Sequence, residues 1–224
     1  MESDATKDMT KNERKPGRMS EQRQQRIRLE ISREAARLFW EQGVAATTGE
    51  QIAAAVGLSV RTLWRYFRNK ESCAEPIVEQ SVEWFVSVLR CWPRQLSFEE
   101  HYVAELAKRP QEQDADLLAA RRMIVLARTE PAIRTAWLMA CDRVEREFVA
   151  VIASRLQRPT DDIEVRLHAA AATSVLRVLS EDISAAVLTG AAPAAIDTPL
   201  KRIEFVVRAF YVATGGVVGD PVDP

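Results

Sequence analysis

The chain has 224 residues, enough for one large domain or two small ones, and 47% of them are hydrophobic. Its low glycine content, 8 residues, is typical of a helical globular protein. The sequence contains no signal-peptide pattern and no run of about eighteen apolar residues. We therefore expect a soluble, cytoplasmic protein with no membrane partner.

The net charge of −1 is unevenly distributed. Residues 1–70 contain 14 Lys and Arg against 9 Asp and Glu, a net charge of +5, whereas residues 71–224 carry a net charge of −6. A basic segment joined to an acidic body is typical of a DNA-binding protein with a separate second domain. Chance asymmetry is the alternative interpretation.

The cysteine pattern argues against a metal site. Cys73, Cys91 and Cys141 are widely spaced, form no C-x-x-C pair, and do not cluster with the two histidines of the chain. We expect buried, reduced thiols, no metal and no cofactor.

The N-terminal residues divide into a tail and a helix. Residues 1–20 are polar without apolar periodicity, which predicts a disordered basic tail. Residues 11–28 contain seven Lys and Arg and two Glu, which suits contact with DNA phosphates or a minor groove; a solvated tail explains them equally well. The first helix is expected over residues 21–42, before Gly43.

Residues 48–70, TGEQIAAAVGLSVRTLWRYFRNK, predict a helix-turn-helix. Thr48 and Gln51 have the spacing of a capping box, and Gly57 tolerates the left-handed backbone that ends a helix. Ser59 is a good N-cap for a second helix, whose outer face is rich in arginine. This geometry places a recognition helix in a major groove. The alternative is an ordinary corner between two helices.

The candidate DNA-binding residues lie in this segment. Arginine pairs readily with guanine, so Arg61, Arg65 and the neighbouring Thr62 are expected to reach base edges. Other candidates are expected to bind phosphates and fix the register. The phosphate-binding candidates are Thr48, Trp64, Tyr66 and Lys70, and Ser59 completes the set at the start of the second helix.

The run AARLFWEQG at residues 35–43 and the segment TTGEQIAAAVGLSVRTLWRYFRNKES at residues 47–72 resemble the N-terminal domain of the tetracycline-repressor (TetR) family. The shared pattern consists of paired alanines and Leu-Phe before a glycine, a capping threonine, an Ala-Val-Gly turn and an aromatic finish. Trp64 stands where the family usually has tyrosine, and Gly49 replaces the usual β-branched residue. The resemblance implies a homodimeric regulator that binds a double-stranded DNA operator.

Apolar periodicity predicts further helices, so the expected fold class is all-α. The helix after Asn69, its expected cap, links the DNA-binding part to the rest of the chain. The predicted helices cover residues 70–92, 97–108, 114–128, 131–157, 161–188 and 200–214. The expected organisation is a helix-turn-helix domain at 21–70, a larger helical ligand-binding and dimerisation domain at 71–214, and a flexible tail at 215–224.

The helix predicted over residues 161–188 is apolar on two faces. One stripe includes Ile163 and Leu167, and the other includes Val165 and Leu176. Such a helix is buried on two sides. The last two helices are therefore the best candidates for a homodimer interface, because paired half-sites favour a dimeric DNA-binding protein. The alternative is a monomeric core.

The resemblance further implies a small-molecule pocket in the C-terminal domain. Methionine and aromatic residues at helical spacing are more often core than pocket. Arg177 is placed to meet an anionic ligand, although an ion pair with Glu181 is the favoured alternative. The candidates are Trp84, Trp92, His101, Tyr102, Met123, Trp137, Cys141 and Arg177. Residues 131–172 also resemble C-terminal domains that bind acyl-CoA-like ligands.

Together these features predict a ligand-responsive, DNA-binding transcriptional regulator. The simplest version is a repressor that a small hydrophobic or acyl-CoA-like effector releases from a palindromic operator. We expect no enzymatic activity, because the sequence shows no nucleophile with a matching base. The alternatives are a helical enzyme that uses Cys141 or paired carboxylates, and a ligand-independent DNA-binding protein.

Overall fold

The computed structural model describes residues 16–108, 114–191, 193–194 and 196–222. Within these ranges the chain forms helices and no strand, so the all-α prediction is confirmed. No helix in this part of the chain is long and apolar enough to cross a membrane. The elements are α1 (Pro16–Gln42), α2 (Gly49–Ala55), α3 (Val60–Tyr66), the 3-10 turn η1 (Glu71–Ala74), α4 (Glu75–Arg90), α5 (Phe98–Ala107), α6 (Asp114–Leu126), α7 (Pro131–Leu156), α8 (Ile163–Thr189) and α9 (Pro199–Ala213).

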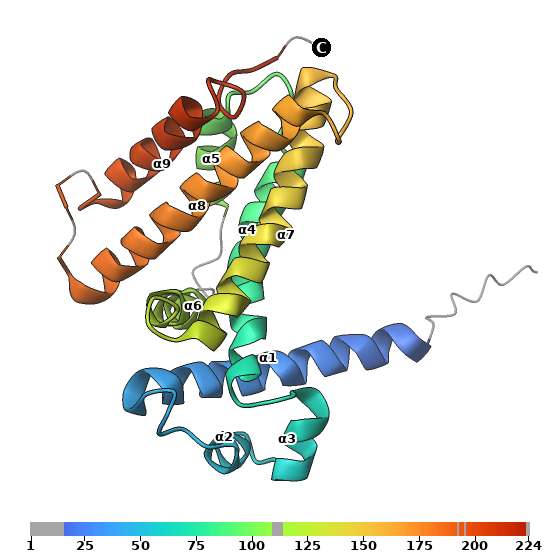
Figure 1. Cartoon of the computed structure of the whole chain (residues 1–224), viewed down its shortest axis with the longest axis vertical. Helices are drawn as coiled ribbons and strands as arrows, with labels where there is room; N and C mark the ends of the chain where they lie inside the picture. The colour runs from blue at the N-terminus through green and yellow to red at the C-terminus, as the bar shows by residue number, and fades with distance from the viewer. Residues whose placement is uncertain (1–15, 109–113, 192, 195, 223–224) are drawn as a thin grey trace, which may run out of the picture.

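Helices α1, α2 and α3 form a small group at one end of the molecule, and the remaining helices form a larger bundle (Figure 1). In the small group, Ile31 and Phe39 of α1, Ile52 of α2 and Leu63 of α3 are fully buried, and the same apolar core continues into the larger bundle. Helix α1 therefore braces the two short helices that follow it, which are too short to be stable alone.

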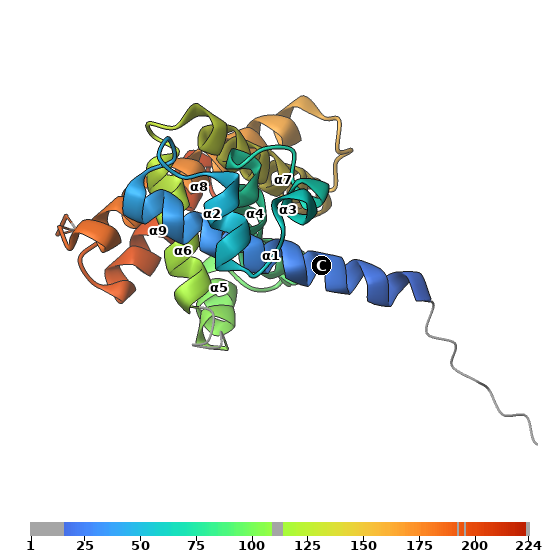
Figure 2. The same ribbon diagram turned by 90° about the horizontal axis from the view of Figure 1, so that it is seen from below.

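Helix α1 starts earlier than the sequence predicted. It begins at Pro16, so residues 16–20 of the predicted tail are helical. Proline suits the first turn of a helix because the missing N–H has no partner there, and Arg18 and Met19 have good helix propensity. The N-terminal part of α1 extends past α3 (Figure 2). Residues 1–15 lie outside the described part of the chain.

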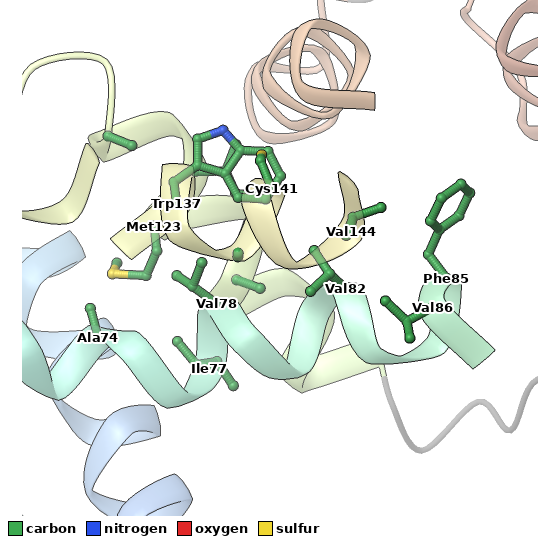
Figure 3. Packing of buried hydrophobic residues seen from close by; sticks show 14 of the residues in the cluster. Ala74, Ile77, Val78, Val82, Phe85, Val86, Met123, Trp137, Cys141 and Val144 are labelled. Carbon is green, nitrogen blue, oxygen red and sulfur yellow. The ribbon is translucent and has the colours of Figure 1, made fainter. Parts of the chain in front are cut away.

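Helix α4 connects the two parts of the molecule. The prediction that it begins at Lys70 is wrong, because residues 71–74 form η1 and α4 begins at Glu75 with Pro76 in its first turn. Asn69 lies two residues before η1, and its Oδ1 accepts from the Ser72 N–H at 2.8 Å. Farther along, the apolar side of α4 packs against α6 and α7: Figure 3 shows Val78 near Met123, and Val82 near Val144.

The C-terminal segment is packed, so the prediction of a flexible tail is wrong for residues 215–222. Val218 is fully buried, and its N–H donates to Thr214 Oγ1 at 2.9 Å. The Gly219 carbonyl accepts from the Phe98 N–H at 2.8 Å, and the Val222 N–H donates to the Arg94 carbonyl at 2.8 Å. The glycines allow this path because Gly215 and Gly216 adopt positive φ angles of 58° and 88°. Residues 223–224 are not part of the described ranges.

Candidate nucleic-acid interface

Two local devices define α2. At its start the predicted capping box is present: Thr48 Oγ1 accepts from the Gln51 N–H at 3.3 Å, and Gln51 Oε1 accepts from the Thr48 N–H at 2.8 Å. At its end Gly57 has a φ angle of 67°, and the Leu58 N–H donates to the Ala53 carbonyl at 2.9 Å. This left-handed glycine reverses the chain sharply and directs it into α3.

Helix α3 is capped by Ser59, as predicted. Its Oγ accepts from the Thr62 N–H at 3.1 Å and lies 2.8 Å from the Thr62 hydroxyl oxygen. Leu63 is fully buried, and α3 packs against α2, so the opposite face of α3 is turned to solvent. The Thr62 hydroxyl already has a partner in Ser59, so a base contact by Thr62 has to share or replace that hydrogen bond.

The exposed face of α3 carries the predicted arginines. Arg61, Trp64 and Arg65 are exposed, and Tyr66 is half-buried. Within the described part of the chain neither arginine forms an ion pair, and the Arg65 guanidinium lies 5.7 Å from the centre of the Tyr66 ring. Two unpaired guanidinium groups one helical turn apart suit major-groove recognition. Their contacts with DNA stay a prediction, as do those of Thr48 and Ser59, which are also exposed.

The structure places Lys70 differently from the sequence prediction. Its ammonium group donates to three backbone carbonyls, at 2.7 Å to Val44, 3.3 Å to Ala45 and 2.8 Å to Thr47. An ammonium group has three N–H donors, and this loop accepts all three. The geometry favours a structural role for Lys70 over the predicted phosphate contact, because no donor is left for DNA.

Comparisons with known proteins agree with this geometry. Residues 31–77 match the family described as "Bacterial regulatory proteins, tetR family". The chain is also 28% identical over 174 residues to the HTH-type transcriptional regulator TcmR of Streptomyces glaucescens. The matched region covers 75% of this chain and 76% of TcmR. Residues 31–77 thus match the tetR family, and about three quarters of the chain is similar to an HTH-type transcriptional regulator.

Solved structures share the fold of the chain at low sequence identity. Salmonella enterica GusR superposes with a TM-score of 0.56 and 18% identity, covering 85% of this chain and 94% of that one. The multidrug binding protein EbrR, in a complex with imidazole, superposes with a TM-score of 0.51 and 18% identity, covering 90% and 96%.

The larger helical bundle contains two adjoining cavities. One has a volume of about 190 Å³ and lies between α4, α5, α6, α7, α8 and α9; the other has a volume of about 330 Å³ and lies between α4 and α6. Ser81, Trp84 and Leu117 line both cavities. The smaller one is mainly apolar and aromatic, with hydroxyl groups from Ser180 and Ser184 among its lining residues. Such a mixture suits a small hydrophobic ligand.

Only part of the predicted ligand set lines these cavities. Trp84, Tyr102 and Trp137 do so. The structure does not support the prediction for four others, which lie in the packed core. Two of them have hydrogen-bond partners within the protein, and the other two are buried among core side chains. The four core residues are Trp92, whose Nε1 donates to the Leu96 carbonyl at 3.0 Å, His101, whose Nε2 lies 2.8 Å from the Val88 carbonyl oxygen, and the buried Met123 and Cys141.

Arg177 also lies outside the lining of both cavities. Its Nη1 is 3.6 Å from Glu181 Oε1, so the alternative of an i,i+4 ion pair is the arrangement present. The same carboxylate oxygen accepts from Arg134 Nη1 at 2.6 Å and from Trp137 Nε1 at 3.0 Å. Glu181 therefore ties the cavity residue Trp137 to two arginines. Sequence reasoning missed these contacts, because Arg134 and Trp137 of α7 lie 47 and 44 residues before Glu181 of α8 in the sequence.

Proposed function

We propose that the chain is a homodimeric repressor whose operator affinity is controlled by a small hydrophobic effector. One observation carries the proposal: an exposed recognition helix with two unpaired arginines is connected through α1 and α4 to a domain that contains apolar cavities. Arg61 and Arg65 would read base edges, while Thr48 and the aromatic residues of α3 would bind phosphates.

Two contacts connect the cavities to the DNA-binding helices. Ser32 of α1 is fully buried, and its hydroxyl oxygen accepts from the Ile77 N–H of α4 at 3.0 Å. Arg33 of α1 donates twice to the Asp116 carboxylate of α6, at 2.7 Å in each case. Asp116 and Leu117 both line the larger cavity. A ligand that displaces α4 or α6 would therefore move α1 and change the spacing of the recognition helices.

A surface on α8 and α9 supports the homodimer. Ile163 and Leu167 of α8 have exposed fractions of 63% and 62%, and Val212 of α9 has an exposed fraction of 70%. Phe205 of α9 is also exposed. Ile163 and Leu167 belong to the apolar stripe of α8 that is not buried in the bundle, and Phe205 and Val212 lie on the exposed side of α9. A partner molecule would bury them, and a two-fold dimer would present two recognition helices to successive half-sites.

The cavity chemistry guides the choice of effectors. The lining favours compact molecules that combine aromatic or aliphatic surface with a few hydrogen-bonding groups. EbrR, which shares the fold, is a multidrug binding protein, which supports a screen of hydrophobic drugs and dyes. Acyl-CoA-like molecules complete the screen. Effector binding worth about 1–3 kcal/mol of coupling would change operator affinity about 5- to 150-fold.

The test is footprinting of the full-length protein on the DNA that flanks its own gene, over a series of salt concentrations. We expect protection of a near-palindrome with an affinity that falls steeply as salt rises. Arg61→Ala combined with Arg65→Ala should abolish sequence-specific protection while the protein stays folded. A folded double variant that protects the same site with unchanged affinity would contradict the proposed recognition helix.

A further inference from the structure

Gly49 occupies a position that does not call for glycine on conformational grounds. It is the first residue of α2, is buried, and does not have a positive φ angle. Glycine within a helix is entropically unfavourable relative to alanine, because it loses more conformational freedom on folding. A glycine here therefore needs another physical reason.

The reason is the side chain of Trp64, on the neighbouring helix α3. A Cβ atom at position 49 would lie 2.2 Å from Trp64 Cζ2 and 2.6 Å from Trp64 Cη2. Separations below 3.0 Å are essentially absent between real Cβ atoms and their neighbours. The six-membered ring of the indole thus lies in the space that any larger residue at position 49 would fill.

Trp64 also belongs to the surface that faces DNA in the proposed function. Its exposed fraction is 42%, so one part of the indole is seated over Gly49 and the rest is open to solvent. It lies next to Arg65 in the sequence and three residues after Arg61, both of which are exposed. An aromatic ring of this kind buries surface against a sugar-phosphate backbone, and its N–H is a phosphate donor.

We propose that Gly49 and Trp64 form a matched pair that sets how this regulator contacts DNA. The inference rests on the proposed function as an operator-binding protein. Trp64 touches the DNA backbone, and Gly49 is a positioning residue that acts only through Trp64. The missing side chain at position 49 lets the indole pack against the start of α2, and this contact holds the indole in one orientation on the binding face.

If the two residues are in contact, substitutions at positions 49 and 64 should not have additive effects on DNA binding. A side chain at position 49 displaces the indole, and a smaller ring at position 64 makes room for that side chain. The effect of Gly49→Thr should therefore be large in the presence of Trp64 and small in the presence of tyrosine. Residues in direct contact are non-additive in this way, whereas independent residues are additive.

The experiment uses the full-length wild-type protein to select a duplex from a random-sequence pool. Affinity for that duplex is then measured over a salt series for the wild type, G49T, W64Y and the G49T/W64Y double variant. Ala55→Thr, an exposed substitution in the same helix, is the matched control. We expect G49T to bind about tenfold or more weakly with a shallower salt slope, and the double variant to bind within about threefold of W64Y.

Two results would overturn the pairing. One is additivity, in which G49T costs the same factor in both backgrounds; the other is a G49T affinity and salt slope equal to those of Ala55→Thr. Thermal unfolding of the four proteins provides a second, DNA-independent cycle, and additive unfolding temperatures would also contradict the contact. If the wild type selects no sequence, the proposed function fails, while the unfolding cycle still decides whether the two residues are coupled.

Discussion

Lys70 donates a hydrogen bond of 2.7 Å to the carbonyl oxygen of Val44, which lies twenty-six residues earlier in the chain. With the carbonyls of Ala45 and Thr47 as further acceptors, the lysine closes the loop between α1 and α2. Lys70, at the end of the helix-turn-helix segment, thus fixes the loop that precedes this segment. The positive charge of Lys70 therefore stabilises the loop between α1 and α2, although it lies near the DNA-binding helices.

Lys70→Met should therefore destabilise the DNA-binding domain. Three carbonyls lose their donor, and we expect a loss of about 1–3 kcal/mol in the free energy of unfolding, measured by chemical denaturation. Operator affinity should fall while its salt slope stays unchanged. Arg68→Met, which removes a largely exposed arginine paired with Glu75, is the control and should cost at most about 1 kcal/mol. A salt slope lower by about one with unchanged stability would instead identify Lys70 as a phosphate contact.

Leu167→Glu should dissociate the proposed dimer. The substitution places a carboxylate in the apolar stripe of α8, and burial of an unpaired charge should weaken self-association by about 100-fold or more. Sedimentation equilibrium measures the dissociation constant directly. Met139→Glu is the matched control, because Met139 has a similar exposed fraction of 61% but lies on α7. Equal dissociation constants for the two variants would place the interface elsewhere.

Arg33→Gln should reduce communication between effector and operator. The ion pair with Asp116 is partly exposed, so its loss should change the free energy of unfolding by less than about 1 kcal/mol. It nevertheless joins α1 to the helix that lines the larger cavity, so the effector-induced change in operator affinity should shrink. Arg37→Gln removes pairs within α1 only and should preserve the response. An undiminished response in Arg33→Gln would assign the coupling to α4 alone.

A chain that ends at Thr214 should be less stable than the full-length protein. It loses the buried Val218 and the Asp220 carbonyl that accepts from Arg155. Arg155 is buried, with its guanidinium carbon 3.6 Å from the centre of the Trp92 ring, and burial lowers its pKa to about 10. We expect a loss of about 2 kcal/mol or more, by thermal or chemical unfolding. A chain that ends at Val222 serves as the control, and equal stability of both truncations would mean that the segment contributes nothing.

The cysteines should differ in reactivity. Burial raises the pKa values of the Cys73 and Cys141 thiols from 9.0 to about 12, whereas Cys91 is exposed. The native protein at pH 8 should therefore react rapidly with a thiol reagent at one site, and at three in denaturant. The pKa values of these two thiols are higher in the folded protein than in the unfolded chain. Protonation of the thiols therefore stabilises the folded state fully below pH 9, and this stabilisation is lost as the pH rises toward 12. Rapid labelling of all three native thiols would contradict the assigned burial.

Much of the fold follows from short-range patterns. The capping box predicted at Thr48 marks a helix start that the structure confirms, because both partners of the box lie within one turn. Helices α5 to α9 lie close to their predicted ranges, since apolar periodicity is a property of each segment. The start of α4 was misplaced because local polarity near Lys70 does not reveal a 3-10 turn before Pro76.

The sequence by itself determined the all-α class, the helix-turn-helix and the arginine-rich outer face of α3. These depend on hydrogen bonds and spacings among residues a few positions apart. Only the tertiary structure decided that Lys70 serves the loop at Val44, that residues 215–222 are packed, and that His101 and Met123 are core rather than cavity. It also revealed that Gly49 and Trp64, two separate departures from a familiar pattern, meet in space. Each of these depends on which distant side chain fills a given volume, and periodicity along one helix carries no information about its neighbour.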